Sequence, residues 1–127
     1  MKLSLTLVLA LAMLFAVAVI ASAETTEPTA SGDWSRADAD SITWEYYEDT
    51  QTLVISGKGA MADAGNANQT PWYDYRGSIT NVVIGEGVTR IGKNAFNNLT
   101  KVTEITVPDA VTYISKYAFM RDRKSVV

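Results

Sequence analysis

"IGEGVTRIGKNAF" (Ile84–Phe96) decides the fold, because a related stretch, "VPDAVTYISKYAF", follows at Val107–Phe119. Aligned at an offset of 23 residues, the two stretches are identical at six of thirteen positions. Ordinary residue frequencies give about one identity in such a window by chance, so the chain contains a genuine repeat. The identical pairs are Val88/Val111, Thr89/Thr112, Ile91/Ile114, Lys93/Lys116, Ala95/Ala118 and Phe96/Phe119.

A period of 23 residues predicts a solenoid with one short strand in each coil. It falls within the range of about 20–29 residues that leucine-rich coils occupy, and "VVI" and "EITV" supply the β-branched runs for the strands. One coil cannot bury its apolar face alone and needs a neighbour with the same pattern. We therefore predict a β-rich, right-handed, leucine-rich-repeat-like coil over residues 82–121, with Phe96 and Phe119 stacked one coil apart.

The residues before the repeat predict an amino-terminal cap over residues 42–81. Ile42, Trp44 and Tyr46 alternate with polar residues, and a second alternating run follows the polar break "YEDTQ". This pattern predicts a β-hairpin, followed by a loop and the aromatic segment "PWYDYRG". The polar residues 24–41 contain Pro28 in their first part, and we predict a flexible leader there.

Residues 1–23 have the features of an export signal. Lys2 precedes an apolar run from Leu3 to Ile20, and Ala21-Ser22-Ala23 fits a signal-peptidase site. We predict cleavage after Ala23 and a secreted or cell-surface location, with membrane contact only through this segment; the alternative is a retained membrane anchor. Cleavage leaves 104 residues with 10 basic and 14 acidic side chains, a net charge of −4.

The composition excludes several kinds of chemistry. The chain has no Cys and no His, which removes thiol nucleophiles, Ser-His-Asp triads and the usual zinc ligands. An acidic net charge argues against a nucleic-acid partner. Carboxylate chemistry and Ca²⁺ binding remain open, but the spacing of Asp33, Asp38 and Asp40 lacks the pattern of a calcium loop. We interpret these three residues as a solvated acidic turn.

Three further motifs have a structural and a functional interpretation. Trp72, Tyr73 and Tyr75 either contact a sugar or a protein, or seal the end of the solenoid, which we favour. "GEGVTRIG" resembles a phosphate loop only superficially, and we assign its glycines to turn geometry. Asn68 and Asn98 begin glycosylation sequons, of which Asn98 is better explained as a turn residue between coils.

The chain resembles the BspA-like leucine-rich repeat family over about Ile42–Phe119. The matching segments are "TLVISGKGAM" (Thr52–Met61), "PWYDYRGSITNVVIGEGVTRIGKNAF" (Pro71–Phe96) and "NNLTKVTEITVPDAVTYISKYAF", which ends at Phe119. The chain departs from the family at Leu99, where a Cys is common. The resemblance implies a secreted or cell-surface bacterial protein that binds host matrix proteins or other macromolecules. It implies no catalysis through the repeats and no fixed set of binding residues.

These observations favour an adhesion-type interaction protein that binds an extracellular protein, a glycan or another cell-surface polymer. We expect no cofactor, no metal site and no catalytic residue, and the oligomeric state is open. The alternative is a targeting module of a secreted hydrolase whose catalytic domain is missing downstream. The side chains expected to face a partner are Arg90, Lys93, Asn94, Tyr113, Lys116 and Tyr117.

The carboxyl end of the chain breaks the repeat. The position equivalent to Leu99 is Asp122, where an apolar residue is expected, and "RKSVV" follows. Fewer than three repeats rarely make a stable solenoid. We therefore interpret residues 122–127 as the non-native end of a truncated chain; the alternative is a naturally short protein.

Overall fold

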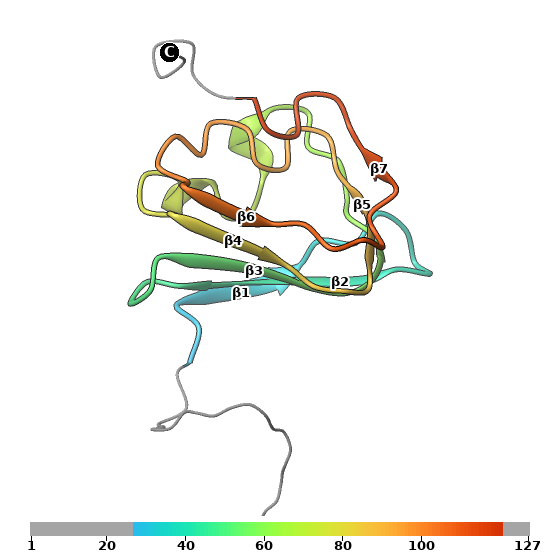
Figure 1. The fold of residues 1–127 in the computed structure, drawn as a ribbon, viewed down its shortest axis with the longest axis horizontal. Helices are drawn as coiled ribbons and strands as arrows, with labels where there is room; N and C mark the ends of the chain where they lie inside the picture. The colour runs from blue at the N-terminus through green and yellow to red at the C-terminus, as the bar shows by residue number, and fades with distance from the viewer. Residues whose placement is uncertain (1–26, 121–127) are drawn as a thin grey trace, which may run out of the picture.

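The computed structural model describes residues 27–120, which form a twisted, strand-rich fold (Figure 1). The predicted signal segment and the predicted non-native end lie outside the described residues. Two short 3-10 helices, η2 (Ala67–Gln69) and η3 (Tyr73–Tyr75), interrupt the strands. The strands are β1 (Ala30–Asp33), β2 (Ser41–Tyr47), β3 (Thr52–Ala60), β4 (Asn81–Ile84), β5 (Val88–Ile91), β6 (Glu104–Thr106) and β7 (Tyr113–Ile114).

Strands β2 and β3 are the antiparallel pair that the alternating pattern predicts. Ile42, Trp44 and Tyr46 on β2 are all buried, and Trp44 lies opposite Ile55 of β3. Successive side chains of a strand point to opposite faces, so one face of this pair carries apolar residues into the core. The polar residues 48–51 connect the two strands.

The prediction of a flexible leader over residues 24–41 is wrong for most of that segment. Ala30–Asp33 form β1, which pairs antiparallel with β2, and the Trp34 backbone N–H donates to the Ile42 carbonyl over 2.9 Å. Three of the four β1 residues are exposed. The strand therefore forms through backbone hydrogen bonds to the edge of β2, and its composition carries no apolar alternation that would reveal it.

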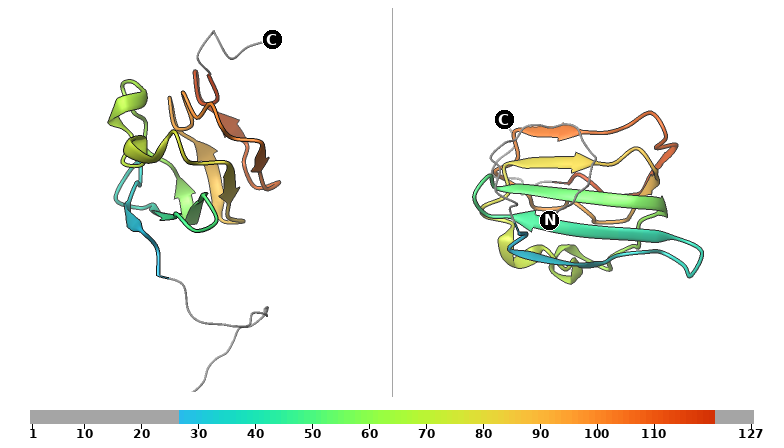
Figure 2. Two further views of the ribbon diagram at one scale, coloured as in Figure 1. Left: turned by 90° about the vertical axis from the view of Figure 1, so that its left-hand side faces the viewer. Right: turned by 90° about the horizontal axis from the view of Figure 1, so that it is seen from below.

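After β3 the chain winds in coils whose strands are parallel, as the two rotated views show (Figure 2). Along one line of strands, Leu53 of β3 lies beside Val82 of β4, and Val82 lies beside Ile105 of β6. Along the second line, β3, β5 and β7 pair, with Ile91 beside Ile114. Between the two repeats, residues 23 apart are neighbours in both lines, which is the register that the repeat predicts, whereas β3 pairs with β4 at an offset of 29. Each coil contains two strands, so the prediction of one strand per coil is wrong.

An aromatic column runs through the core from coil to coil. The rings of Trp72 and Phe96 are stacked with centroids 6.0 Å apart, and those of Phe96 and Phe119 are stacked at 5.5 Å. Trp72 is fully buried, and its indole N–H donates to the Ala95 carbonyl over 2.9 Å. The predicted stacking of Phe96 on Phe119 is confirmed.

The coils approach one another closely at glycine positions. A Cβ atom on Gly92 would lie only 1.9 Å from the carbonyl oxygen of Ala62, and one on Gly87 would lie 2.2 Å from that of Gly57. Backbone atoms of successive coils therefore touch where a side chain would separate them.

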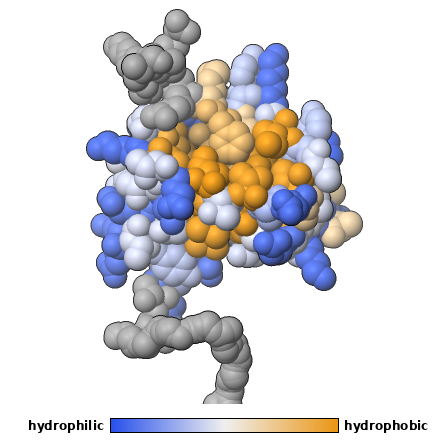
Figure 3. All heavy atoms as spheres, in the orientation of Figure 1, coloured by the Kyte–Doolittle hydropathy of each residue, from blue (hydrophilic) through white to orange (hydrophobic). Residues whose placement is uncertain are grey.

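The last described coil leaves apolar side chains at the surface. Ile91 is fully buried, whereas its equivalent Ile114 is 50% exposed because no further strand lies beside β7 among the described residues. A shallow depression of about 270 Å³ opens on the same end, between the side chains of Phe96, Ile105 and Phe119. Figure 3 shows apolar side chains gathered in the middle of this face. Among the described residues, no further strand packs on this apolar face.

Substituting Gly92 tests the close approach of the coils. We expect Gly92→Ala to lower the free energy of unfolding by about 1–3 kcal/mol, because the methyl group would overlap a backbone oxygen that cannot move alone. Gly77→Ala is the matched control, since a Cβ there meets no atom within 4 Å. Urea denaturation followed by circular dichroism gives both values, and equal stability of the two variants would contradict the prediction.

Truncating the two phenylalanines tests the aromatic column. We expect Phe96→Ala to cost about 3–5 kcal/mol, because its ring is buried between two others. Phe119→Ala removes a partly buried ring with one described ring neighbour and should cost about 1–2 kcal/mol. Chemical denaturation measures both losses; a larger loss for Phe119→Ala would show that the column is not organised as described.

Candidate functional site

The outer surface of β5, β7 and the turns after them carries most of the residues predicted to contact a partner. We call this surface the β5–β7 face; it consists of Arg90, Lys93, Tyr113, Lys116 and Tyr117. Tyr113 is 56% exposed and Tyr117 44% exposed. The Arg90 guanidinium lies 5.2 Å from the centre of the Tyr113 ring, and the Lys116 ammonium lies 4.8 Å from that of Tyr117. Each tyrosine ring thus lies beside a cationic side chain, and the cation–π attraction stabilises this position.

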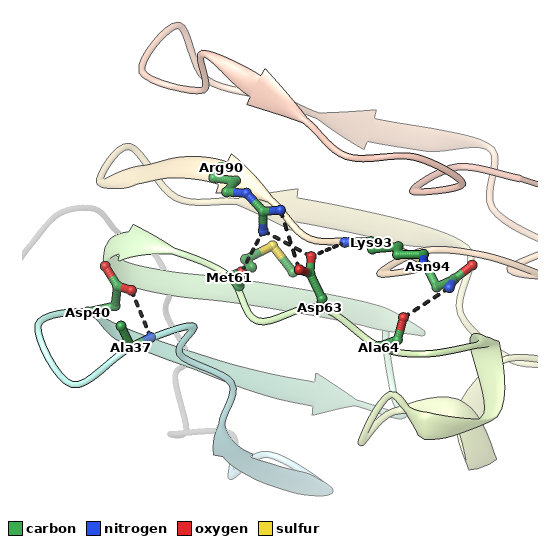
Figure 4. A network of polar contacts seen from close by, with 8 residues as sticks. All are labelled: Ala37, Asp40, Met61, Asp63, Ala64, Arg90, Lys93 and Asn94. Carbon is green, nitrogen blue, oxygen red and sulfur yellow. Dashed lines mark hydrogen bonds and ion pairs between the residues drawn. The ribbon is translucent and has the colours of Figure 1, made fainter.

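Beside this face, Asp63 ties the loop after β3 to the first coil (Figure 4). Its carboxylate accepts hydrogen bonds from the Arg90 guanidinium at 3.0 Å and from the Lys93 backbone N–H at 2.7 Å. Arg90 also donates to the Met61 carbonyl over 3.2 Å. The Arg90 side chain is only 15% exposed. Its main role is therefore to form the ion pair with Asp63 and to contact the ring of Tyr113.

The charge network lowers the pKa of Asp63 from its ordinary value. Burial of the carboxyl group acts in the opposite direction, and it is outweighed by the Lys93 backbone N–H and by the Arg90 guanidinium, which both favour the charged form. The carboxylate is therefore the form that the folded protein stabilises.

The prediction that Asn94 faces a partner is wrong. Asn94 is only 4% exposed. Its side-chain amide donates to the Ala64 carbonyl over 3.0 Å, and its oxygen accepts from the side chain of Asn97. With φ at +59°, Asn94 adopts the left-handed conformation that Asn tolerates better than most residues. Its repeat equivalent, Tyr117, has φ at +62° and remains exposed.

The structure separates the three aromatic residues of the "PWYDYRG" segment. Trp72 is buried in the aromatic column, and Tyr75 stacks on Tyr46 with ring centroids 4.5 Å apart. Tyr73 is partly exposed, and the Arg76 guanidinium lies 3.8 Å above its ring. Tyr73 is thus the one member of this group with a ring that a ligand could contact.

Among the acidic residues considered for Ca²⁺, Asp40 makes hydrogen bonds that stabilise the fold. Both carboxylate oxygens of Asp40 accept backbone hydrogen bonds, from Ala60 at 3.1 Å and from Ala37 at 3.0 Å. Over residues 27–120, no group of three acidic side chains lies close enough together to hold a metal ion. In the same range, no helix has the length and apolarity needed to cross a membrane.

The remaining motifs have local structural explanations. The first two glycines of "GEGVTRIG" flank a turn, as predicted, in which the Val88 backbone N–H donates to the Gly85 carbonyl over 3.2 Å. Gly87 is also required by close approach to the backbone of Gly57. Asn98 is a turn residue, as predicted: its φ is +66°, and its backbone N–H donates to the Met120 carbonyl over 2.8 Å.

Comparison with known proteins places these features in a family. Residues 70–125 match the model described as "BspA type Leucine rich repeat region (6 copies)". The fold and the repeat define a leucine-rich repeat protein, and the repeat part of the chain belongs to the BspA-type family.

One solved structure is similar to this chain, a leucine-rich repeat protein from Eubacterium ventriosum ATCC 27560. The two share 36% sequence identity with a TM-score of 0.61, over 71% of this chain. This chain spans 23% of the length of that protein. No curated protein matches the sequence.

The lowered pKa of Asp63 gives a test by pH. A carboxyl group whose pKa is lowered by folding stabilises the protein above its unfolded pKa and loses this effect as pH falls through the folded value. The Asp63 side chain is 40% exposed, so solvent screening limits the effect to less than about 1 kcal/mol. We expect Asp63→Asn to remove this part of the stability loss below about pH 4. Asp74→Asn, at an exposed position outside the network, is the control, and identical pH profiles for wild type and Asp63→Asn would contradict the assignment.

Proposed function

We propose that this protein is a secreted or cell-surface interaction module that binds an extracellular protein or a cell-surface polymer through the β5–β7 face. Membership of the BspA-type family supports a non-catalytic, surface-exposed binding module. The apolar run and small residues at positions 1–23 support export.

The observation that carries this proposal is the exposure of two tyrosines, each beside a cationic side chain. Tyr113 and Tyr117 stand on the outer side of β7 and its following turn, and each ring has a cationic neighbour. The backbone beneath them is fixed by parallel pairing between β5 and β7. Tyrosine offers a large contact area with few rotatable bonds, which lowers the entropy lost on binding.

We further propose that the coil is right-handed and that β1 to β3 form a cap on its first turn. Three antiparallel strands stand before the first parallel pair, and Trp34 and Trp44 pack edge-on against Trp72, where the aromatic column begins. A terminal unit that covers the apolar end of a repeat array keeps the array soluble. The cap thus supports the binding face without contributing to it.

A binding screen with paired variants tests this function. We expect the full chain to bind at least one member of a panel of extracellular matrix proteins and a glycan array. Combined Tyr113→Ser and Tyr117→Ser changes should weaken that binding at least about tenfold, which is about 1.4 kcal/mol. Lys58→Ser, at an exposed position on β3, is the control. Absence of binding across the whole panel, or equal loss in the control, would count against the proposal.

A further inference from the structure

A second surface, outside the β5–β7 face, has the features of a ligand site. A shallow depression of about 270 Å³, open to solvent, lies between the two 3-10 helices and the turn at residues 97–98. We call it the Tyr73 cavity; its lining includes Asn66, Asn68, Tyr73, Asn97, Asn98 and Met120. A wider depression of about 550 Å³ adjoins it and shares Tyr73 and Asn98 with it.

Four carboxamide side chains line this cavity, and one of them has a buried, unused hydrogen-bonding group. Asn68 is exposed and Asn98 is partly exposed, so both side chains are accessible to a ligand. The Asn97 side chain donates to the Asn94 oxygen over 2.7 Å, and its own oxygen is buried and unpartnered. Asn97 is only 9% exposed. A buried acceptor without a donor is unfavourable, and a ligand hydroxyl could donate to it directly or through a water.

The Tyr73 ring adds one flat apolar surface to these amides. Arg76 covers one face of the ring and lines the wider depression, but it does not line the Tyr73 cavity. The other ring face is thus the one left for a ligand. The backbone N–H of Tyr73 donates to the Thr70 carbonyl over 3.1 Å, and the neighbouring Trp72 is fixed in the core, so the ring is held in place before any ligand arrives.

These features favour a neutral sugar over other ligands. Carboxamides both donate and accept hydrogen bonds, as the hydroxyl groups of a sugar do. None of the described residues that line the cavity is charged, so it has no group to pair with a phosphate or an ammonium. Its apolar side chains other than the Tyr73 ring are Ala67 and Met120, which form no deep pocket for a peptide side chain.

We propose that the Tyr73 cavity binds one neutral pyranose unit of a saccharide, with the sugar ring stacked on Tyr73 and its hydroxyl groups bonded to Asn68, Asn97 and Asn98. The adjoining depression then receives the next unit of the chain. This inference goes beyond the proposed function, because it uses different residues and holds whether or not the β5–β7 face binds a macromolecule.

An NMR titration tests the proposal. Isotope-labelled full chain is titrated with N-acetylglucosamine, glucose and maltose up to tens of millimolar. We expect the side-chain amide signals of Asn68, Asn97 and Asn98 to shift with at least one sugar. Tyr73→Ala should weaken that binding at least about tenfold, whereas Tyr73→Phe retains the flat ring and should bind nearly as well as wild type. Tyr113→Ala, at an exposed tyrosine on the β5–β7 face, should leave the sugar affinity unchanged.

Asn68→Ala provides a second variant at an exposed position, and it should weaken sugar binding without affecting the fold. The proposal is overturned if none of the three sugars shifts these amides, if the shifts map to the β5–β7 face, or if a neutral peptide such as trialanine shifts them equally. Tyrosine variants of the β5–β7 face that lose macromolecule binding should still bind the sugar with unchanged affinity. The two proposals can therefore fail separately.

Discussion

The parallel register between successive coils is the constraint on which the rest of the structure depends. Val82 lies beside Ile105 and Phe96 lies beside Phe119, so these apolar side chains of one coil meet their counterparts in the next. A shift of one residue would turn the side chains of a strand to the opposite face. The backbone contacts at Gly87 and Gly92 also favour this register, because they permit the coils to meet closely only when it is kept.

The two candidate sites follow from this frame in different ways. The β5–β7 face consists of side chains on two paired strands and on the turns that follow them, so corresponding positions of both coils contribute to it. The Tyr73 cavity belongs to η2, η3 and a turn of the first coil, and it has no second copy among residues 27–120. A repeat frame can therefore combine an extended contact surface with one local site of defined shape.

The sequence is most informative where contacts repeat. An offset of 23 residues predicts the pairing of β4 with β6 and the stacking of Phe96 on Phe119, and alternation predicts the pair of β2 and β3. The second line of strands, through β5 and β7, was not predicted. Both patterns reflect burial, which leaves a periodic trace in residue type. The repeat residues are also the ones that resemble the BspA-type family, and this part of the chain matches the family model.

Contacts that occur once leave no such trace. Strand β1 forms through backbone hydrogen bonds to β2. Its exposed side chains give the sequence pattern of a loop. The burial of Asn94 depends on the loop that contains Ala64, and the pairing of Arg90 depends on Asp63, which has no repeat equivalent. Trp72, Tyr73 and Tyr75 are adjacent aromatic residues, and only the three-dimensional structure distinguishes the two in the core from the one at the surface.

The difference in burial between Ile91 and Ile114 has a dynamic consequence. In a linear array each coil is stabilised mainly by its immediate neighbours, and the last described coil has a neighbour on one side only. Local opening should therefore start at β6 and β7 and proceed inward, and backbone amides such as that of Ser115, which donates to the Ile91 carbonyl, should exchange with solvent before those of β2 and β3. Within residues 27–120, opening should thus proceed from β7 toward β2.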